Sequence, residues 1–133
     1  IVSASETQTI LGICLGMQML ASIGFEYGET KGLDLISGEV KKIDCHGSVP
    51  HIGFNSISIT KDCPLFAGVT HEDSFYFMHS YEFINYTDIL SLTTYNNHQF
   101  VSSIQKGNVY GVQFHPEKSR SCGLKVLQNF IEL

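Results

Sequence analysis

The spacing of apolar side chains predicts a helix near each end of this chain. Residues 9–13 form a short apolar run of strand length, and residues 15–25 then repeat apolar side chains at helical spacing. The apolar positions of that first helix are Leu15, Met19, Leu20 and Ile23, with Gly24 as a stop signal. A second helix is predicted at 121–133, with Leu124, Leu127 and Ile131 on one face.

Between the two helices the pattern changes to short runs of β-branched and aromatic residues, separated by Asn, Gly and Asp. These runs predict strands at 36–43, 55–60, 75–83, 89–95, 100–106 and 109–114. Residues 26–35 and 50–54 are expected to be loops, and 64–69 a single helical turn. The predicted elements are a strand and a helix, then a run of strands, then a helix. This order indicates one α/β domain over residues 1–133 with an antiparallel segment in its middle.

The strand predicted at 9–13 lies almost at the start of the chain. A buried strand in a parallel sheet needs a neighbour on each side. We therefore expect further residues upstream of this segment.

Composition excludes several classes of function. The chain is 43% hydrophobic with a net charge of -5 and no basic cluster, so a nucleic-acid partner is not expected. No apolar run is long enough to span a membrane, and no secretion signal is visible. Free thiols in the cytoplasm are the simplest interpretation of the four cysteines, Cys14, Cys45, Cys63 and Cys122. His46 and His51 make no metal site without further ligands, so no metal is expected.

Cys14 lies between the predicted strand and helix in a Gly-x-Cys-x-Gly pattern. This is the arrangement of a nucleophile elbow, where Gly12 and Gly16 would lie too close to neighbouring backbone for a side chain. The helix N-terminus would favour the thiolate, and the Leu15 amide would face an oxyanion. The alternative is a buried structural cysteine flanked by glycines.

His115 and Glu117 follow the last predicted strand. Side chains two apart on an extended segment share a face, so both would point the same way, with Pro116 between them. The histidine could take a thiol proton while the carboxylate orients its ring. Alone, this segment would more often be a solvated turn, but with the elbow it predicts a Cys14, His115 and Glu117 triad.

Two segments resemble the class I, triad-type glutamine amidotransferases: 12–18 (GICLGMQ) and 111–117 (GVQFHPE). Three further segments resemble the glutaminase branch of imidazole glycerol phosphate synthase: 50–55 (PHIGFN), 76–81 (YFMHSY) and 118–119 (KS). The resemblance implies a flavodoxin-like α/β fold that lacks its N-terminal βα units here. It also implies no cofactor, and a second oxyanion donor in the absent segment.

The resemblance implies that Cys14 attacks the side-chain amide of L-glutamine, releasing ammonia and leaving a thioester that water hydrolyses. Gly16 and Gln18 on the elbow helix, Glu26, Ser80 and Tyr81 match the family's substrate-binding positions. Gln18 could instead be a helix-surface residue and Glu26 a solvated loop acid. His79 is expected to be a hydrogen-bonded structural histidine.

In this family ammonia passes to a separate barrel-shaped synthase subunit, here for histidine biosynthesis. His51, Phe54, Asn55 and Lys118 match the partner-facing surface. Phe54 stands where the branch usually has Trp, which leaves open a paralogue that supplies a surface-sugar amidination enzyme. Two further hypotheses are a non-catalytic partner-binding fragment and a cysteine peptidase-like hydrolase. Gln18 and the Lys118-Ser119 extension argue against the peptidase.

Overall fold

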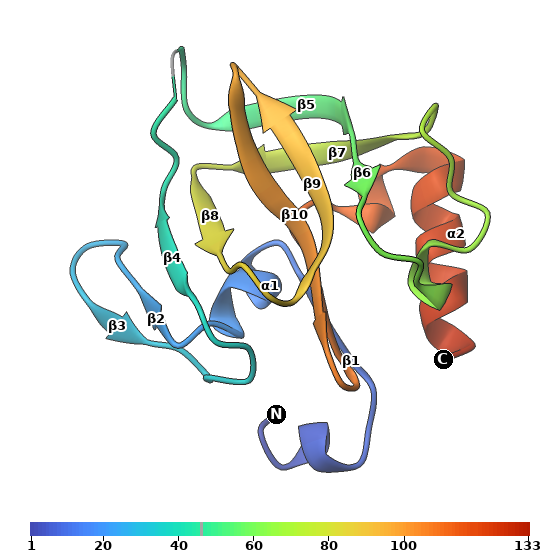
Figure 1. Cartoon of the computed structure of the whole chain (residues 1–133), viewed down its shortest axis with the longest axis horizontal. Helices are drawn as coiled ribbons and strands as arrows, with labels where there is room; N and C mark the ends of the chain where they lie inside the picture. Colours follow the sequence, from blue (N-terminus) through green and yellow to red (C-terminus); the bar gives the residue numbers. More distant parts are fainter. Residues whose placement is uncertain (46) are drawn as a thin grey trace.

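The computed structural model describes residues 1–45 and 47–133 and contains short helices around a mixed sheet (Figure 1). The α-helices are α1 (Leu15–Met19) and α2 (Arg120–Ile131), and the 3-10 helices are η1 (Ala4–Glu6), η2 (Pro64–Phe66) and η3 (Pro116–Lys118). The strands are β1 (Ile10–Ile13), β2 (Ile23–Gly24), β3 (Thr30–Lys31), β4 (Glu39–Lys42), β5 (His51–Ser56), β6 (Ser58–Ile59), β7 (Ser74–His79), β8 (Tyr81–Ile84), β9 (Ile89–Tyr95), β10 (His98–Lys106) and β11 (Val109–Val112).

The larger sheet has the strand order β1-β11-β10-β8-β4-β2-β3, and β9 pairs with β10 and β6. Its pairs are antiparallel except β1 with β11 and β2 with β4, which are parallel. Strands β5 and β7 form a separate two-stranded ribbon. The predicted α/β class with an antiparallel segment in its middle is confirmed.

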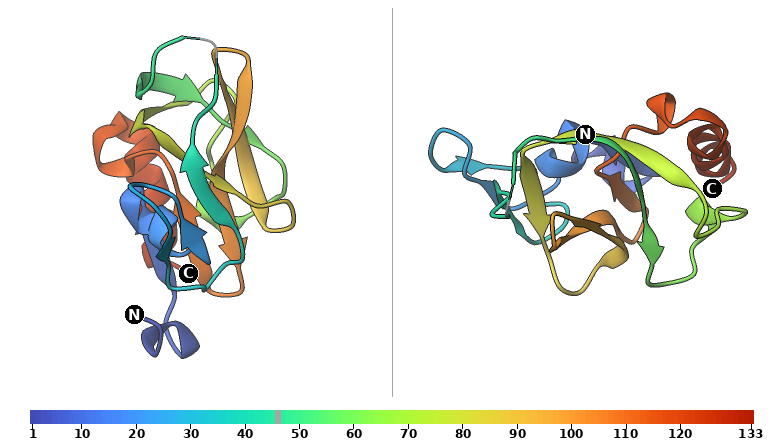
Figure 2. Two further views of the ribbon diagram at one scale, coloured as in Figure 1. Left: turned by 90° about the vertical axis from the view of Figure 1, so that its left-hand side faces the viewer. Right: turned by 90° about the horizontal axis from the view of Figure 1, so that it is seen from above.

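Helices α1 and α2 lie on the same side of the molecule (Figure 2). Helix α1 packs on β1 and β11, and its Met17 is fully buried in a cluster with Phe83 and Ile104. Helix α2 packs on η2, η3 and β7, beside a second cluster rich in phenylalanine. The first cluster anchors the helix that follows Cys14, through Met17, and the second anchors the segment after β11, through Phe114.

The first helix is shorter than predicted and ends at Met19. Its last carbonyls accept hydrogen bonds from the following loop, for example Leu33 N to Met19 O at 2.9 Å. Ile23 and Gly24 then join the sheet as β2, next to β4. Ile23 is β-branched and Gly24 has low helix propensity, so pairing with the sheet prevails over the helical period.

Three other predictions are corrected. The face of α2 that packs inward carries Cys122 and Val126, whereas Leu124 and Ile131 are 52% and 80% exposed. The strand predicted at 75–83 is two strands that diverge at Ser80, because β7 pairs with β5 while β8 pairs with β4 and β10. The loop expected at 50–54 mostly belongs to β5.

Candidate active site

The parallel pairing of β1 and β11 brings the two predicted catalytic segments to one edge of the sheet. Ile13 lies opposite Val112, and the amide of Cys14 donates to the carbonyl of Val112 at 2.8 Å. Cys14 therefore follows the end of β1, and Gln113 and His115 follow the end of the neighbouring β11, at the same edge of the sheet. Active sites of α/β sheets form at such carboxyl ends.

The backbone at Cys14 is strained in the way an elbow requires, with φ at 52° and ψ at -107°. A Cβ on Gly12 would lie 2.6 Å from the carbonyl oxygen of Gly16, so only glycine fits at position 12. A Cβ on Gly16 would meet nothing within 4 Å. The prediction that both glycines avoid a clash is thus wrong for Gly16, whose backbone is the surface against which Gly12 packs.

The Cys14 thiol is hydrogen-bonded to groups of Met78 and Gln113, which lie far from it along the chain. It donates to the carbonyl of Met78 at 3.7 Å and accepts from Nε2 of Gln113 at 3.6 Å. Burial raises the pKa of the Cys14 thiol, while the Leu15 amide, the Gln113 amide and the Lys118 charge act in the opposite direction. The Leu15 amide at the helix N-terminus favours the thiolate as expected, but burial has the larger effect on the pKa, so the thiol needs a base.

His115 is paired with the predicted carboxylate. Its Nδ1–H donates to Oε2 of Glu117 at 2.9 Å, so in the neutral ring Nε2 is the free acceptor. That Nε2 is buried and has no hydrogen-bond partner among the described residues. The pair does not lie on an extended segment as predicted: β11 ends at Val112, and the turn of η3 brings Glu117 back to the ring.

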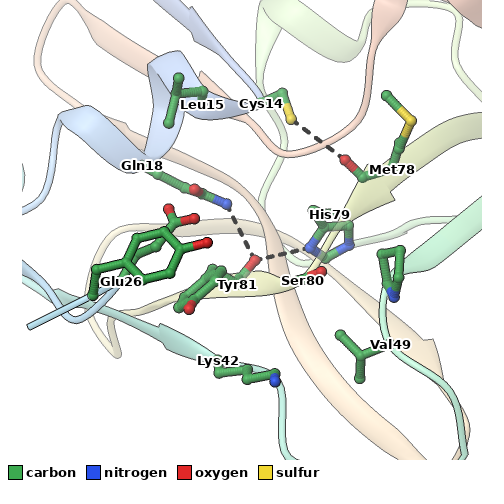
Figure 3. Close-up of a pocket in the computed structure, with 12 residues that line it drawn as sticks. Cys14, Leu15, Gln18, Glu26, Lys42, Val49, Met78, His79, Ser80 and Tyr81 are labelled. Atoms are coloured by element: carbon green, nitrogen blue, oxygen red, sulfur yellow. Dashed lines mark hydrogen bonds between the residues drawn. The ribbon is translucent and has the colours of Figure 1, made fainter.

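A cavity of about 480 Å³ opens beside Cys14 (Figure 3). It is lined by the predicted substrate-binding residues Gln18, Glu26, Ser80 and Tyr81, together with Cys14, Leu15, Tyr27, Lys42, Val49, Pro50, Met78 and His79. Glu26 supplies a carboxylate and Lys42 an ammonium group to the same cavity. Gly16, His115 and Glu117 are not part of its lining.

Gln18 is not a solvated helix-surface residue. Its Nε2 donates to the carbonyl of Tyr81 at 3.2 Å and to Oε1 of Gln113 at 3.1 Å. Gln113 is completely buried and joins Gln18 to Cys14. Sequence patterns did not single out Gln113, Lys42 or Met78; Gln113 was detectable as a polar residue at the end of an otherwise apolar strand.

The family of the chain follows from a comparison of its whole length with known proteins. Residues 2–133 match the family described as "Glutamine amidotransferase class-I". The chain belongs to this family.

Two relatives of this amidotransferase chain carry the name imidazole glycerol phosphate synthase subunit HisH. The protein from Pelagibacter ubique is 45% identical, over 98% of this chain and 65% of the relative. The protein from Methanocaldococcus jannaschii is 47% identical, over 92% of this chain and 63% of the relative. The chain thus spans a little less than two thirds of the length of these relatives.

Solved structures agree on the amidotransferase fold. A putative GMP synthase subunit from Thermoplasma acidophilum superposes with a TM-score of 0.67 at 25% identity, over 93% of this chain and 56% of that one. A crystal structure described as a glutamine amidotransferase gives a TM-score of 0.66 at 18% identity, over 98% and 64%.

The residues expected to face a partner separate into two groups in this amidotransferase chain. Phe54 is 43% exposed, with the Arg120 guanidinium 4.4 Å from its ring centre, and Lys118 lies 5.8 Å from the ring of Tyr76. His51 is only 3% exposed, so the expectation that its side chain faces a partner is wrong. Alternation along β5 turns His51 and Asn55 inward, and the Asn55 amide donates to the carbonyl of Thr94 at 2.9 Å.

No cluster of potential metal ligands occurs among the described residues, and His46 lies outside them. In the same part of the chain, no helix has both the length and the apolar character that a membrane crossing requires. All four cysteines are free thiols.

Proposed function

We propose that this chain carries the glutaminase site of an amidotransferase, which hydrolyses L-glutamine to glutamate and ammonia in the cytoplasm. The observation that carries the proposal is the strained Cys14, next to a cavity with groups of both charges and on the same sheet edge as the His115–Glu117 pair. Family membership makes glutamine the substrate to test first.

In the proposed reaction, Nε2 of His115 takes the Cys14 thiol proton as Sγ attacks the amide carbon of glutamine. The Leu15 amide donates to the oxygen that becomes negatively charged. The C–N bond then breaks, and His115 returns the proton to the departing nitrogen, which leaves as ammonia. His115 next activates a water molecule that hydrolyses the thioester to glutamate and regenerates the thiol. Glu117 stabilises the imidazolium in both steps.

The cavity offers a complement to each end of the substrate. We assign the α-ammonium group of glutamine to the carboxylate of Glu26 and its α-carboxylate to Lys42, because both residues line the cavity and carry the opposite charges. Both amide hydrogens of Gln18 are used within the protein, so Gln18 presents only an acceptor, its Oε1, to the ligand. Ser80 and Tyr81 also line the cavity (Figure 3).

The ammonia acceptor we propose is a barrel-shaped synthase subunit of the HisF type, because the similar proteins are HisH subunits of imidazole glycerol phosphate synthase. The outward face of the β5–β7 ribbon supports a docking surface next to the site. Ile52, Phe54 and Met78 are exposed there at 57%, 43% and 42%, beside the charges of Lys118 and Arg120. Exposed apolar groups rimmed by charges are typical of interfaces.

The test is glutamate release from glutamine by the purified chain, alone and with a HisF-type subunit. We expect release that requires Cys14 and disappears in Cys14→Ala, whereas Cys63→Ala, at a thiol outside the cavity, retains it. A glutamine-analogue electrophile should label Cys14, with competition by glutamine but not by peptides. Release that is unchanged in Cys14→Ala, or labelling that peptides block, would contradict the proposal.

A further inference from the structure

Two buried histidines lie directly opposite each other in the β5–β7 ribbon. His51 and His79 form a register pair and are 3% and 5% exposed. Nδ1 of His51 lies 3.0 Å from Nε2 of His79. Neither residue belongs to the proposed triad, and His79 also lines the cavity beside Cys14.

The directions of their hydrogen bonds follow from one carbonyl. Nδ1 of His79 lies 2.9 Å from the carbonyl oxygen of Tyr81, which can only accept, so this nitrogen carries the proton. Nε2 of a neutral His79 is then an acceptor, and Nδ1 of His51 must donate to it. Nε2 of His51 in turn accepts from the Asn55 amide at 3.4 Å. Each ring is thereby restricted to its Nδ1–H tautomer.

Both rings are uncharged at neutral pH because they are buried. Desolvation lowers the pKa of His51 to about 4, and the neighbouring His79 acts in the same direction. Desolvation also lowers the pKa of His79 to about 4, with a smaller effect of His115, although the bond to Tyr81 opposes this. A second proton on His79 would make its Nε2 a donor that faces the Nδ1–H of His51, so the two N–H groups would repel each other.

Aromatic side chains prevent the His51 ring from turning. It stacks between Phe77 and Tyr95, whose ring centres lie 4.8 Å and 4.1 Å away. His79 packs against the ring of Phe100 at 4.9 Å. The pair is therefore fixed in orientation as well as in tautomer.

The Tyr81 carbonyl links this pair to the substrate side. It accepts from both Nδ1 of His79 and Nε2 of Gln18, as the two dashed lines that meet at Tyr81 show (Figure 3). Gln18 continues to Gln113, and Gln113 to the Sγ of Cys14. One continuous series of hydrogen bonds thus runs from Asn55 on β5 to the nucleophile.

We propose that His51 and His79 are positioning residues for the glutamine site: they fix the Tyr81 carbonyl and thereby hold the Gln18 amide with its oxygen toward the ligand. The proposal deepens the function proposed above and rests on it. In the opposite tautomer, the Nδ1 lone pair of His79 would face the Tyr81 oxygen. That repulsion would displace the carbonyl, leave one Gln18 hydrogen unpaired and allow its amide to turn.

The decisive variant is His51→Phe, which keeps a ring between Phe77 and Tyr95 but removes the donor to His79. Its matched control is Tyr95→Phe, which keeps the ring next to His51 and loses only the hydroxyl bond to the Ser48 carbonyl. The readout is the glutamine concentration that half-protects Cys14 from iodoacetamide, measured on folded protein. Histidine 15N NMR of the wild-type chain reports the tautomers independently of turnover.

We expect Nδ1–H signals from both histidines at pH 7. In His51→Phe the His79 ring loses the donor to its Nε2 and is held only by the Tyr81 carbonyl, so the half-protecting concentration should rise about tenfold, the effect of one lost hydrogen bond. Tyr95→Phe should behave as wild type. A purely structural role would lower the folded fraction of His51→Phe and leave the half-protecting concentration of the folded protein unchanged.

A second pair of variants decides the question if His51→Phe does not fold. His79→Asn retains a donor near the position of Nδ1 and should keep protection close to wild type, whereas His79→Leu should lose it. This proposal alone would be overturned if His51→Phe or His79→Leu were protected by glutamine as well as the wild-type chain is. It would also be overturned if NMR showed the Nε2–H tautomer at His79. Absence of protection in the wild-type chain would instead contradict the proposed function and this proposal with it.

Discussion

The completely buried amide of Gln113 donates to the Sγ of Cys14 at 3.6 Å. This bond favours the thiolate and partly opposes the rise in the thiol pKa that burial causes. Gln113 also accepts from Gln18, so it supports the nucleophile and the ligand-binding amide together.

Replacing Gln113 with Met should therefore raise the pKa of Cys14 further and slow its alkylation. We expect the rate of alkylation by iodoacetamide at pH 7.5 to fall several-fold, because a smaller fraction of the thiol is ionised. The pH profile of alkylation measures this directly. Gln99→Met, at an exposed glutamine on β10, serves as control, and an unchanged profile in Gln113→Met would contradict the prediction.

The two glycines that flank Cys14 should respond differently to alanine. Gly12→Ala places a Cβ 2.6 Å from the Gly16 carbonyl oxygen and should cost about 1–3 kcal/mol in the free energy of unfolding, as other overpacked substitutions do. Gly16→Ala enters open space within α1 and should be neutral or stabilise by about 0.5–1 kcal/mol, because alanine favours helix. Urea denaturation of both variants tests the contrast, and equal losses would disprove it.

Neutralising Glu117 should reduce kcat more than it changes KM. In Glu117→Gln the side chain still accepts from Nδ1 of His115 but no longer stabilises the imidazolium by charge. We expect a loss of about tenfold in kcat, less than for a fully buried triad acid, because half of the Glu117 side chain is exposed. Glutaminase kinetics across pH measure it, with Glu132→Gln at the end of α2 as control. A pure KM effect would argue against the assigned role.

Acid should destabilise the fold through His51 and His79. Their folded-state pKa values of about 4 lie below the ordinary 6.5, so the unfolded chain binds more protons between these limits. Stability is then complete above pH 6.5 and is lost as the pH falls toward 4, by about 2 kcal/mol for each histidine at pH 5. Urea denaturation at pH 7 and pH 5 should show a smaller loss in His51→Phe than in wild type. The same loss in both would contradict this origin.

The exposed face of the β5–β7 ribbon should contribute affinity for a barrel-type partner. Phe54, held by the Arg120 guanidinium at 4.4 Å, is the aromatic side chain best placed to anchor it. Phe54→Ala should weaken binding by about 2 kcal/mol, roughly 30-fold in Kd. Titration calorimetry with a HisF-type subunit measures the change. Tyr86→Ala, at an aromatic that is 87% exposed in a turn, should have no effect; equal weakening in both would exclude this surface.

The local sequence determined the elements that depend on residue patterns within a few positions, such as glycine spacing, apolar alternation and proline. The Gly-x-Cys-x-Gly pattern predicts the elbow because its backbone requires glycine at position 12, which depends on neighbours only a few residues away. Strand β9 and the helical turn η2 appear where apolar alternation and proline predict them. The end of α1 could not be predicted in this way, because hydrogen bonds from a loop more than ten residues downstream terminate it.

By itself, the sequence determined the chemical groups of the candidate site: a thiol, an imidazole and carboxylates in motifs specific to one family. Only the tertiary structure decided how deeply these groups are buried and how readily they ionise. Burial raises the pKa of the Cys14 thiol, and β5–β7 pairing places His51 inside the protein against His79 instead of on its surface. Desolvation and cross-strand pairing depend on residues far apart along the chain, so no local pattern contains them.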